Sequence, residues 1–282
     1  MAGTAQSKLL FVGLCMAALA AYPLAAGSYG LDLVTKIMVY AVFALSLELL
    51  VGATGLVCFG HAAFFGIGAY AAVLGSPGND AANLLLLAGL AVASAAAYAL
   101  FMGALSLRTQ GVYFIMVTLA FAQMAYYIVH DTPLGGGTDG IYLNVKPVLG
   151  SLDMGDARSI YYTTLACLVA VFGFLALLLR SRFGRALAGI KANEQRMRAT
   201  GFSTYPYKLA AFVLSGAIAG LAGFLFGVKD GYVNPELMAW HLSGAVLIMI
   251  ILGGLGHLRG ALVGAFAFAL LQEFFKSEAV FG

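Results

Sequence analysis

Seven long runs of apolar residues dominate this chain and set what it can fold into. Each holds about 20 mostly apolar residues, the length that an α-helix needs to cross the hydrocarbon core of a bilayer. The runs are continuous and do not alternate between apolar and polar positions, which excludes the strands of a membrane barrel. The sequence therefore predicts an all-α polytopic membrane protein. The runs are 9–26, 33–52, 55–75, 81–107, 111–130, 159–180 and 209–228.

The stretch 243–275 holds two more apolar runs, but glycines, His257 and Arg259 interrupt it. We expect two short helices or a broken pair there, because irregular backbone at membrane depth is tolerated only where protein or water covers it. With this stretch, the chain is predicted to form a bundle of about 8–9 transmembrane helices in a single domain, residues 1–282. The first run is interpreted as a retained helix, because repeated crossings follow it.

Composition agrees with a membrane location and excludes other classes of protein. Hydrophobic residues make up 62% of the chain and charged residues 10%, against about 45–50% apolar residues in a soluble domain. Disordered chains show the opposite balance. A net charge of +3 supplies no basic face for nucleic acid. The three cysteines lie far apart in apolar runs and match no metal spacing.

The basic residues are concentrated in one loop. Seven of the fifteen Lys and Arg residues lie between positions 180 and 208, beside a single acid, Glu194. Because short loops rich in Lys and Arg face the cytoplasm, we expect the loop 181–208 to be cytoplasmic. Counting crossings from there puts the loop 131–158 outside and the N-terminus inside.

The same loop is predicted to contain a short helix that lies across the membrane surface. Strong helix formers fill the sequence between Gly184 and Gly201. Leu187 and Ile190 belong to an apolar side that suits a groove on a partner protein, whereas the cations suit lipid head groups. Composition alone leaves docking and anchoring both open.

Two ionisable residues stand nearly alone within the apolar runs. Intramembrane ionisable groups are by default functional candidates, although a lone histidine in an apolar stretch is more often a packing residue. Without a chain of acids and histidines, a proton-coupled carrier is disfavoured. The candidates for a translocation pathway or gate are Glu48, Gly60, His61 and Phe64.

Small residues recur at four-residue spacing, which lets membrane helices pack closely. Gly60-His61 is also echoed by Gly256-His257, 196 residues later. Duplicated halves are common in transporters, but chance matching in Gly/Ala-rich helices is the alternative. The spaced glycines are Gly216 and Gly220, Gly223 and Gly227, and Gly256, Gly260 and Gly264.

The sequence contains no motif for nucleotide hydrolysis or for other catalysis. It has no GxxxxGK[ST] phosphate loop, no HExxH and no GxSxG. The glycines of GGGTDG at 135–140 fit GxGxxG formally, but no strand precedes them, so a tight turn is the simpler interpretation. We therefore expect no catalytic residue, no metal and no cofactor in this chain.

Several segments together resemble the permease subunit of bacterial high-affinity branched-chain amino acid ABC importers, of the second permease type. The resemblance covers about residues 33–275. It rests on GHAAFFG with GAY at 60–70, on GGTDG at 136–140, and on the loop from Gly184 to Gly201 with the helix that follows it to Gly223. Relatives usually carry another hydrophobic helix beyond the position of Gly282.

The resemblance implies a type II ABC importer-like permease of the bacterial inner membrane, with its N-terminus in the cytoplasm. Loop 181–208 would be the coupling loop that docks on an ATPase, and loop 131–158 would face a substrate-binding protein. The coupling residues implied are Arg185, Ala188, Ile190, Lys191, Asn193, Glu194 and Gly201. The extracytoplasmic loop residues implied are Gly136, Gly137, Thr138, Asp139 and Gly140.

The partners implied are a second homologous permease, two cytoplasmic ATP-binding subunits, a periplasmic substrate-binding protein and the lipid bilayer. ATP and Mg would bind to the ATPase subunits, which agrees with the lack of a phosphate loop here. Urea, short amides or other amino acids are the alternative substrates. An autonomous secondary carrier or channel is the alternative of another class.

Overall fold

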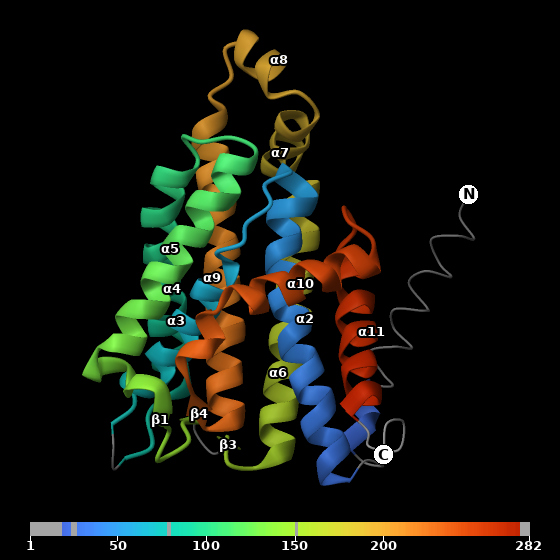
Figure 1. Ribbon diagram of the computed structural model, residues 1–282. Coiled ribbons are helices and arrows are strands. Elements are labelled where there is room, and N and C mark those ends of the chain that lie inside the picture. The colour runs from blue at the N-terminus through green and yellow to red at the C-terminus, as the bar shows by residue number, and fades with distance from the viewer. Residues whose placement is uncertain (1–18, 24–26, 78–79, 150–151, 277–282) are drawn as a thin grey trace, which may run out of the picture.

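The computed structural model describes residues 19–23, 27–77, 80–149 and 152–276, and it shows a helical bundle (Figure 1). The predicted first run, 9–26, lies mostly outside the described residues. Among the described residues, six helices are long and apolar enough to cross a membrane, which confirms an all-α polytopic fold. They are α2 (Ser28–Thr54), α4 (Leu84–Ser106), α5 (Val112–Asp131), α6 (Ala157–Arg180), α9 (Thr204–Asp230) and α11 (Leu258–Lys276).

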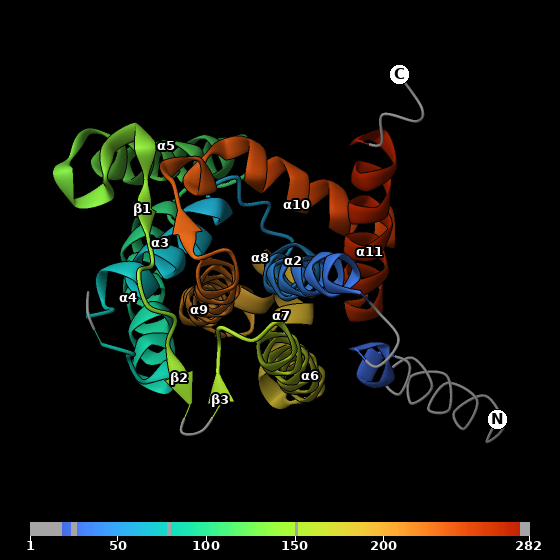
Figure 2. The same cartoon turned by 90° about the horizontal axis from the view of Figure 1, so that it is seen from below.

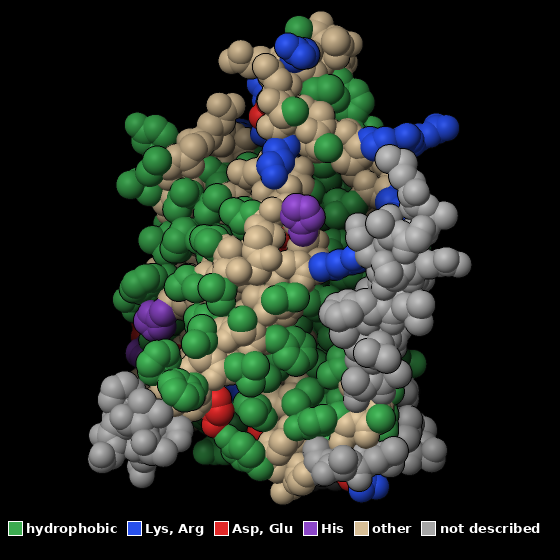
Figure 3. Space-filling view, turned by 90° about the vertical axis from the view of Figure 1, so that its right-hand side faces the viewer, with side chains coloured by type: hydrophobic (Ala, Val, Ile, Leu, Met, Phe, Trp, Pro, Cys, Tyr) green, Lys and Arg blue, Asp and Glu red, His purple; other side chains and the backbone are tan. Residues whose placement is uncertain are grey.

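Helices α2 and α9 form the centre of the bundle. Seen along its axis, they lie side by side, with α3 (His61–Leu74) and α4 flanking α9, and α6, α10 (Trp240–Gly253) and α11 around α2 (Figure 2). The apolar windows of α2 and α9 are mostly buried, whereas fewer than a third of the residues in those of α4, α5 and α6 are buried. Hydrophobic side chains cover much of the described part of the side face in Figure 3. The exposed apolar faces of the outer helices thus suit contact with lipid tails.

The predicted span 55–75 is not a single helix. It consists of an irregular stretch after α2 and the 14-residue helix α3 (His61–Leu74), which is about 21 Å long at 1.5 Å per residue. Helix α2 ends at Gly55, whose φ of 76° is left-handed, a conformation that favours glycine. The sequence pattern missed this break because the apolar residues continue through it.

Helix α3 packs backbone to backbone against α9. A Cβ on Gly68 would collide with the backbone of Gly220, and one on Gly223 with the carbonyl of Phe65. The predicted role of the spaced glycines of α9 in close helix packing is therefore confirmed for Gly220 and Gly223.

The interrupted stretch 243–275 forms two helices, as expected. Helix α10 (Trp240–Gly253) runs obliquely across the front of the bundle in Figure 1, and α11 follows it after a short turn. The two pack closely, because a Cβ on Gly253 would meet the carbonyl of Gly260 and one on Gly264 that of Met249. The turn between them, residues 254–257, is called the elbow below.

The echoed Gly-His pairs occupy similar places. Gly60-His61 opens α3 after an irregular stretch, and Gly256-His257 precedes α11 after the elbow. Their surroundings differ, since His61 is buried and His257 is exposed. The echo thus extends to local structure but not to burial.

Short strands close one end of the bundle, called the strand end. Strand β1 pairs with β4 in antiparallel register, Ile141 opposite Val233, and β2 pairs with β3. The first pair ties the loop after α5 to the end of α9. The elements here are β1 (Ile141–Tyr142), β2 (Val148–Leu149), β3 (Leu152–Asp153), β4 (Tyr232–Val233), and the short 3₁₀ helices η1 (Pro133–Gly135), η2 (Gly137–Asp139) and η3 (Pro235–Met238).

The opposite end, called the basic end, carries two short helices instead of the one predicted from the loop sequence. Helix α7 (Arg182–Ala192) and helix α8 (Glu194–Ala199) are separated by Asn193. Asn193 has an extended backbone, and its side chain accepts a hydrogen bond of 2.9 Å from the Arg196 amide. Helix propensity missed the break because asparagine acts here as the N-cap of a new helix.

Candidate functional site

Helix α7 uses its apolar side within the chain. Ser181 caps its start, accepting a hydrogen bond from the Gly184 amide. Gly184, Leu187 and Ile190 are buried, and α7 contacts α2, α6 and α9. Ile190, predicted to belong to the coupling surface, therefore packs inward. The apolar side of α7, which suggested docking in a groove of a partner, packs against the helices of this chain instead.

The outer side of α7 and α8 is cationic. Arg185, Ala188, Lys191 and Asn193 are exposed, and α8 forms the tip of the molecule in Figure 1. Gly201 ends this region with a φ of +83°. Four arginines are exposed, and their guanidinium groups form no hydrogen bond or ion pair with any described residue. They are Arg180, Arg182, Arg185 and Arg196.

Glu194 fastens α8 to the start of α9. Its carboxylate accepts hydrogen bonds from Arg198 at 2.6 Å and from Thr204 at 2.9 Å. Lys208 Nζ lies 2.9 Å from Oε1 and 3.0 Å from Oε2 of the same group. Of the residues predicted to contact a partner, Glu194 thus has a structural role that the sequence did not indicate.

Charge in this cluster stabilises the ionised carboxylate. Partial burial alone would raise the pKa of Glu194, but hydrogen bonds from Lys208, Thr204 and Arg198 together with the Lys208 charge bring the pKa below its ordinary value. Lys208 is buried, and Glu194 neutralises its charge. This charge is therefore not available to a partner.

Lys191 and Glu48 both make contacts to backbone near the basic end of α2. Lys191 Nζ donates to the Gly52 carbonyl at 2.7 Å. Glu48 is buried, and its Oε1 accepts a hydrogen bond of 2.7 Å from the Gly256 amide in the elbow. Glu48 Oε2 has no hydrogen-bond partner among the described residues.

The histidine candidate lies inside the bundle. His61 is fully buried and shares a hydrogen bond of 2.7 Å with Ser46 of α2. Its ring stacks on Phe43 and meets Phe64 edge to face. Gly60 lies against the backbone of Thr118, where a Cβ would collide. The surroundings are those of a packing residue, and a role of these residues in a pathway or gate stays a prediction.

The glycine-rich loop lies at the strand end, far from the basic end (Figure 1). Gly136, Gly137 and Gly140 adopt left-handed φ values of 71°, 63° and 68°, which glycine allows without strain. Thr138 and Asp139 are exposed. The interpretation as a glycine-permitted turn is confirmed, and this loop lies apart from the other two groups of candidate residues, which approach each other where Lys191 and Glu48 meet at Gly52.

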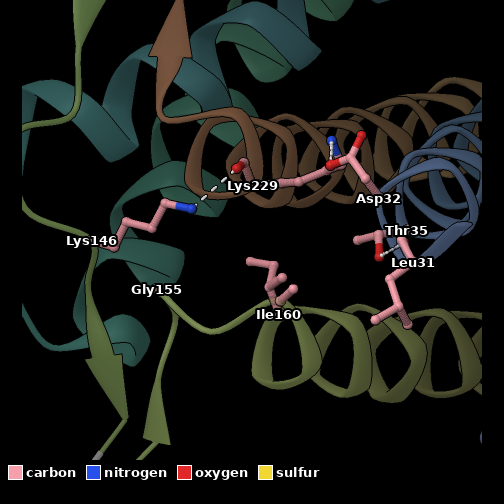
Figure 4. A pocket seen from close by; sticks show the side chains of 8 residues that line it. Leu31, Asp32, Thr35, Lys146, Gly155, Ile160 and Lys229 are labelled. Carbon is pink, nitrogen blue, oxygen red and sulfur yellow. Dashed lines mark hydrogen bonds and ion pairs between the residues drawn. The ribbon is translucent and has the colours of Figure 1, made fainter. Parts of the chain in front are cut away.

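The sequence did not single out an ionic contact at the strand end. Lys229 of α9 lies beside Asp32 of α2, and Lys146 donates to the Lys229 carbonyl at 3.3 Å. These side chains line a cavity of about 100 Å³ (Figure 4). The acid and the base are 197 positions apart, so only the fold brings them together. Among the described residues, no three His, Cys, Asp or Glu side chains are grouped to hold a metal.

Comparison with known proteins gives one consistent result. The family model of the branched-chain amino acid transport system permease component matches residues 29–279. The LivM permease proteins of high-affinity branched-chain amino acid transport in Salmonella typhimurium and Escherichia coli are 31% and 30% identical, over 97% of this chain and 69% of their own length. The BraD permease protein of Pseudomonas aeruginosa is 26% identical over 83% of this chain and 81% of its own. No solved structure matches.

Proposed function

Because the chain belongs to the permease component family of branched-chain amino acid transport systems, we propose that it pairs with a second, homologous permease to form a pathway for branched-chain amino acids. The chain is an ABC importer permease subunit. Two ATP-binding subunits that bind ATP and Mg would drive it from the cytoplasm, and a periplasmic binding protein would deliver the substrate. In this proposal the protein resides in the bacterial inner membrane with a cytoplasmic N-terminus.

The observation that carries the proposal is the cationic surface of α7 and α8. Arg182, Arg185 and Arg196 are exposed on the two short helices that lie at one end of the bundle. No ion pair within the described chain neutralises them. Since this end is the basic end, the positive-inside rule assigns it to the cytoplasm, where an ATPase would be reached.

The contacts within the loop support a mechanical role. Glu194 of α8 binds Lys208 of α9, and the buried Ile190 packs α7 against the bundle. A partner that pulls on the exposed arginines would therefore move the ends of the helices and not merely a flexible loop. Rigid-body movements of this kind switch transporters between outward and inward openings.

The strand end supports delivery of substrate from outside. Gly136 to Gly140 form an exposed turn that β1 and β4 hold against the end of α9. A solvent-facing turn positioned by a strand pair suits contact with a folded binding protein. The pathway itself offers few charged groups, so selection among branched-chain amino acids, other amino acids, urea and short amides would lie mainly in the binding protein.

Co-purification tests the coupling surface. Replacing Arg185 and Arg196 by Glu reverses two exposed, unpaired charges without touching the Glu194 cluster. We expect the ATPase subunits to be lost from the purified complex, while the second permease stays bound. Arg158→Glu, an exposed charge at the strand end, is the matched control and should retain the ATPase. Full ATPase retention by the double variant would contradict the proposal.

A further inference from the structure

Glu48 occupies a position where the basic end and the elbow meet. It lies on α2, six residues before Thr54, and only 3% of it is exposed. Helix α2 contacts both α7 and the α10–α11 pair. A movement of α7 can reach α10 and α11 through this end of α2.

The first contact of this connection is between α7 and α2. Gly52 belongs to the last turn of α2, where backbone carbonyls lack partners within the helix. Lys191 Nζ donates to this carbonyl at 2.7 Å. A cation at a helix C-terminus also interacts favourably with the helix dipole. Lys191 thus fixes the position of α7 relative to the end of α2.

The second contact is between α2 and the elbow. Glu48 Oε1 accepts the Gly256 amide at 2.7 Å. The elbow has little regular structure of its own, with φ values of +96° at Gly254 and +88° at Gly256. Glu48 therefore fixes one point of a turn that glycine leaves free to change conformation.

Gly52 connects the two contacts. A Cβ at Gly52 would collide with the carboxylate of Glu48, so only glycine lets that carboxylate lie along the helix and reach Gly256. The same residue supplies the carbonyl that Lys191 binds. One turn of α2 thus joins α7 on one side to the elbow on the other.

We propose that Glu48 is a positioning residue that transmits the movement of α7 to the α10–α11 elbow through its hydrogen bond to Gly256. The inference rests on the proposed function, because it assumes that an ATPase moves α7. The required property of Glu48 is an acceptor oxygen at this position, not a charge. This distinguishes the proposal from a proton-carrying or cation-binding role of the unpaired Oε2.

The experiment uses the whole complex in proteoliposomes, with the binding protein and radiolabelled leucine. The measured quantity is leucine imported per ATP hydrolysed. Glu48→Met keeps the length of the side chain but removes the acceptor, and we expect the ratio to fall about tenfold or more while ATP hydrolysis continues. Glu48→Gln keeps the acceptor and should retain the wild-type ratio. An equal loss in Glu48→Gln and Glu48→Met would overturn the proposal.

Lys191 provides the second arm. Lys191→Met should lower the ratio, whereas Lys191→Arg, which keeps a donor, should retain it. Because the two contacts act in series, the double variant Glu48→Met/Lys191→Met should be no worse than the more impaired single variant. Losses that multiply would show independent sites and would contradict the connection.

Gly52→Ala covers the case in which Glu48→Met fails to assemble. It keeps the Glu48 side chain but displaces its carboxyl group, and the same loss of coupling is expected. A wild-type ratio in Glu48→Met or Gly52→Ala would overturn this inference alone. A wild-type complex that imports no leucine with ATP would instead contradict the proposed function.

Discussion

Lys229 Nζ lies 2.7 Å from Asp32 Oδ1 and joins the two central helices, α9 and α2, at the strand end (Figure 4). The lysine side chain is 6% exposed, and Asp230 also accepts from it at 2.8 Å. Asp32 is 64% exposed, so solvent screens much of the attraction. The ion pair thus sets which faces of α2 and α9 meet more than it adds to stability.

Removing this cation should loosen the strand end modestly. We expect Lys229→Met to lower the free energy of unfolding by about 1 kcal/mol, the scale of a partly exposed ion pair. Lys36→Met is the control, since Lys36 lies one turn from Asp32 and forms no ion pair with a described residue. Thermal unfolding of the purified complex measures both. An equal loss of stability in both variants would show that the Lys229–Asp32 pair has no specific role.

Much of the fold follows from hydrophobic run length alone. The runs at 33–52, 81–107, 111–130, 159–180 and 209–228 correspond to helices of the structure within a few residues. The break before α3 did not follow, because apolar residues fill both the irregular stretch and the helix. Whether a buried segment is helical there depends on what packs against it, such as α9 against Gly68, and the local sequence does not contain that information.

The site was predictable as a region but not residue by residue. Charge counting located the basic loop, and helix propensity indicated its helical content. Charge counting could not distinguish the exposed arginines from Lys208, which is buried and forms an ion pair with the Glu194 carboxylate. It also assigned Ile190 to a partner, although the chain buries it. Only tertiary contacts distinguish a side chain used internally from one left for a partner.

The Glu194 cluster should stabilise the basic end in a pH-dependent way. Glu194→Gln removes the counter-charge of the buried Lys208, and we expect a loss of about 1–3 kcal/mol. Because the folded-state pKa of Glu194 lies below its ordinary value of 4.5, the contribution is full above that value. It is lost as the pH falls through the lowered pKa.

A pH series of unfolding measurements tests this sign. The difference between wild type and Glu194→Gln should be constant from neutral pH down to about 5 and should shrink at more acidic pH. Glu236→Gln, an exposed carboxylate without a hydrogen bond to the described residues, should show no comparable difference. A stability difference that grows on acidification would contradict the assignment.

The contact between α3 and α9 should not tolerate a methyl group. In Gly223→Ala the new Cβ would meet the Phe65 carbonyl, so the two backbones must separate. We expect a destabilisation of about 1–3 kcal/mol, as for other overpacked sites. Gly89→Ala on α4 is the matched control, because nothing lies within 4 Å of its Cβ. Equal stability of both variants would show that α3 adjusts freely.

The central claim is that this chain imports its substrate only as part of an ATP-driven complex. Its most direct test is leucine uptake into proteoliposomes that contain the chain, the second permease, the ATPase subunits and the binding protein, with and without ATP. We predict uptake that requires ATP and stops when the ATPase subunits are omitted. Uptake by the chain alone, or uptake that persists without ATP, would identify an autonomous carrier or channel and contradict the account.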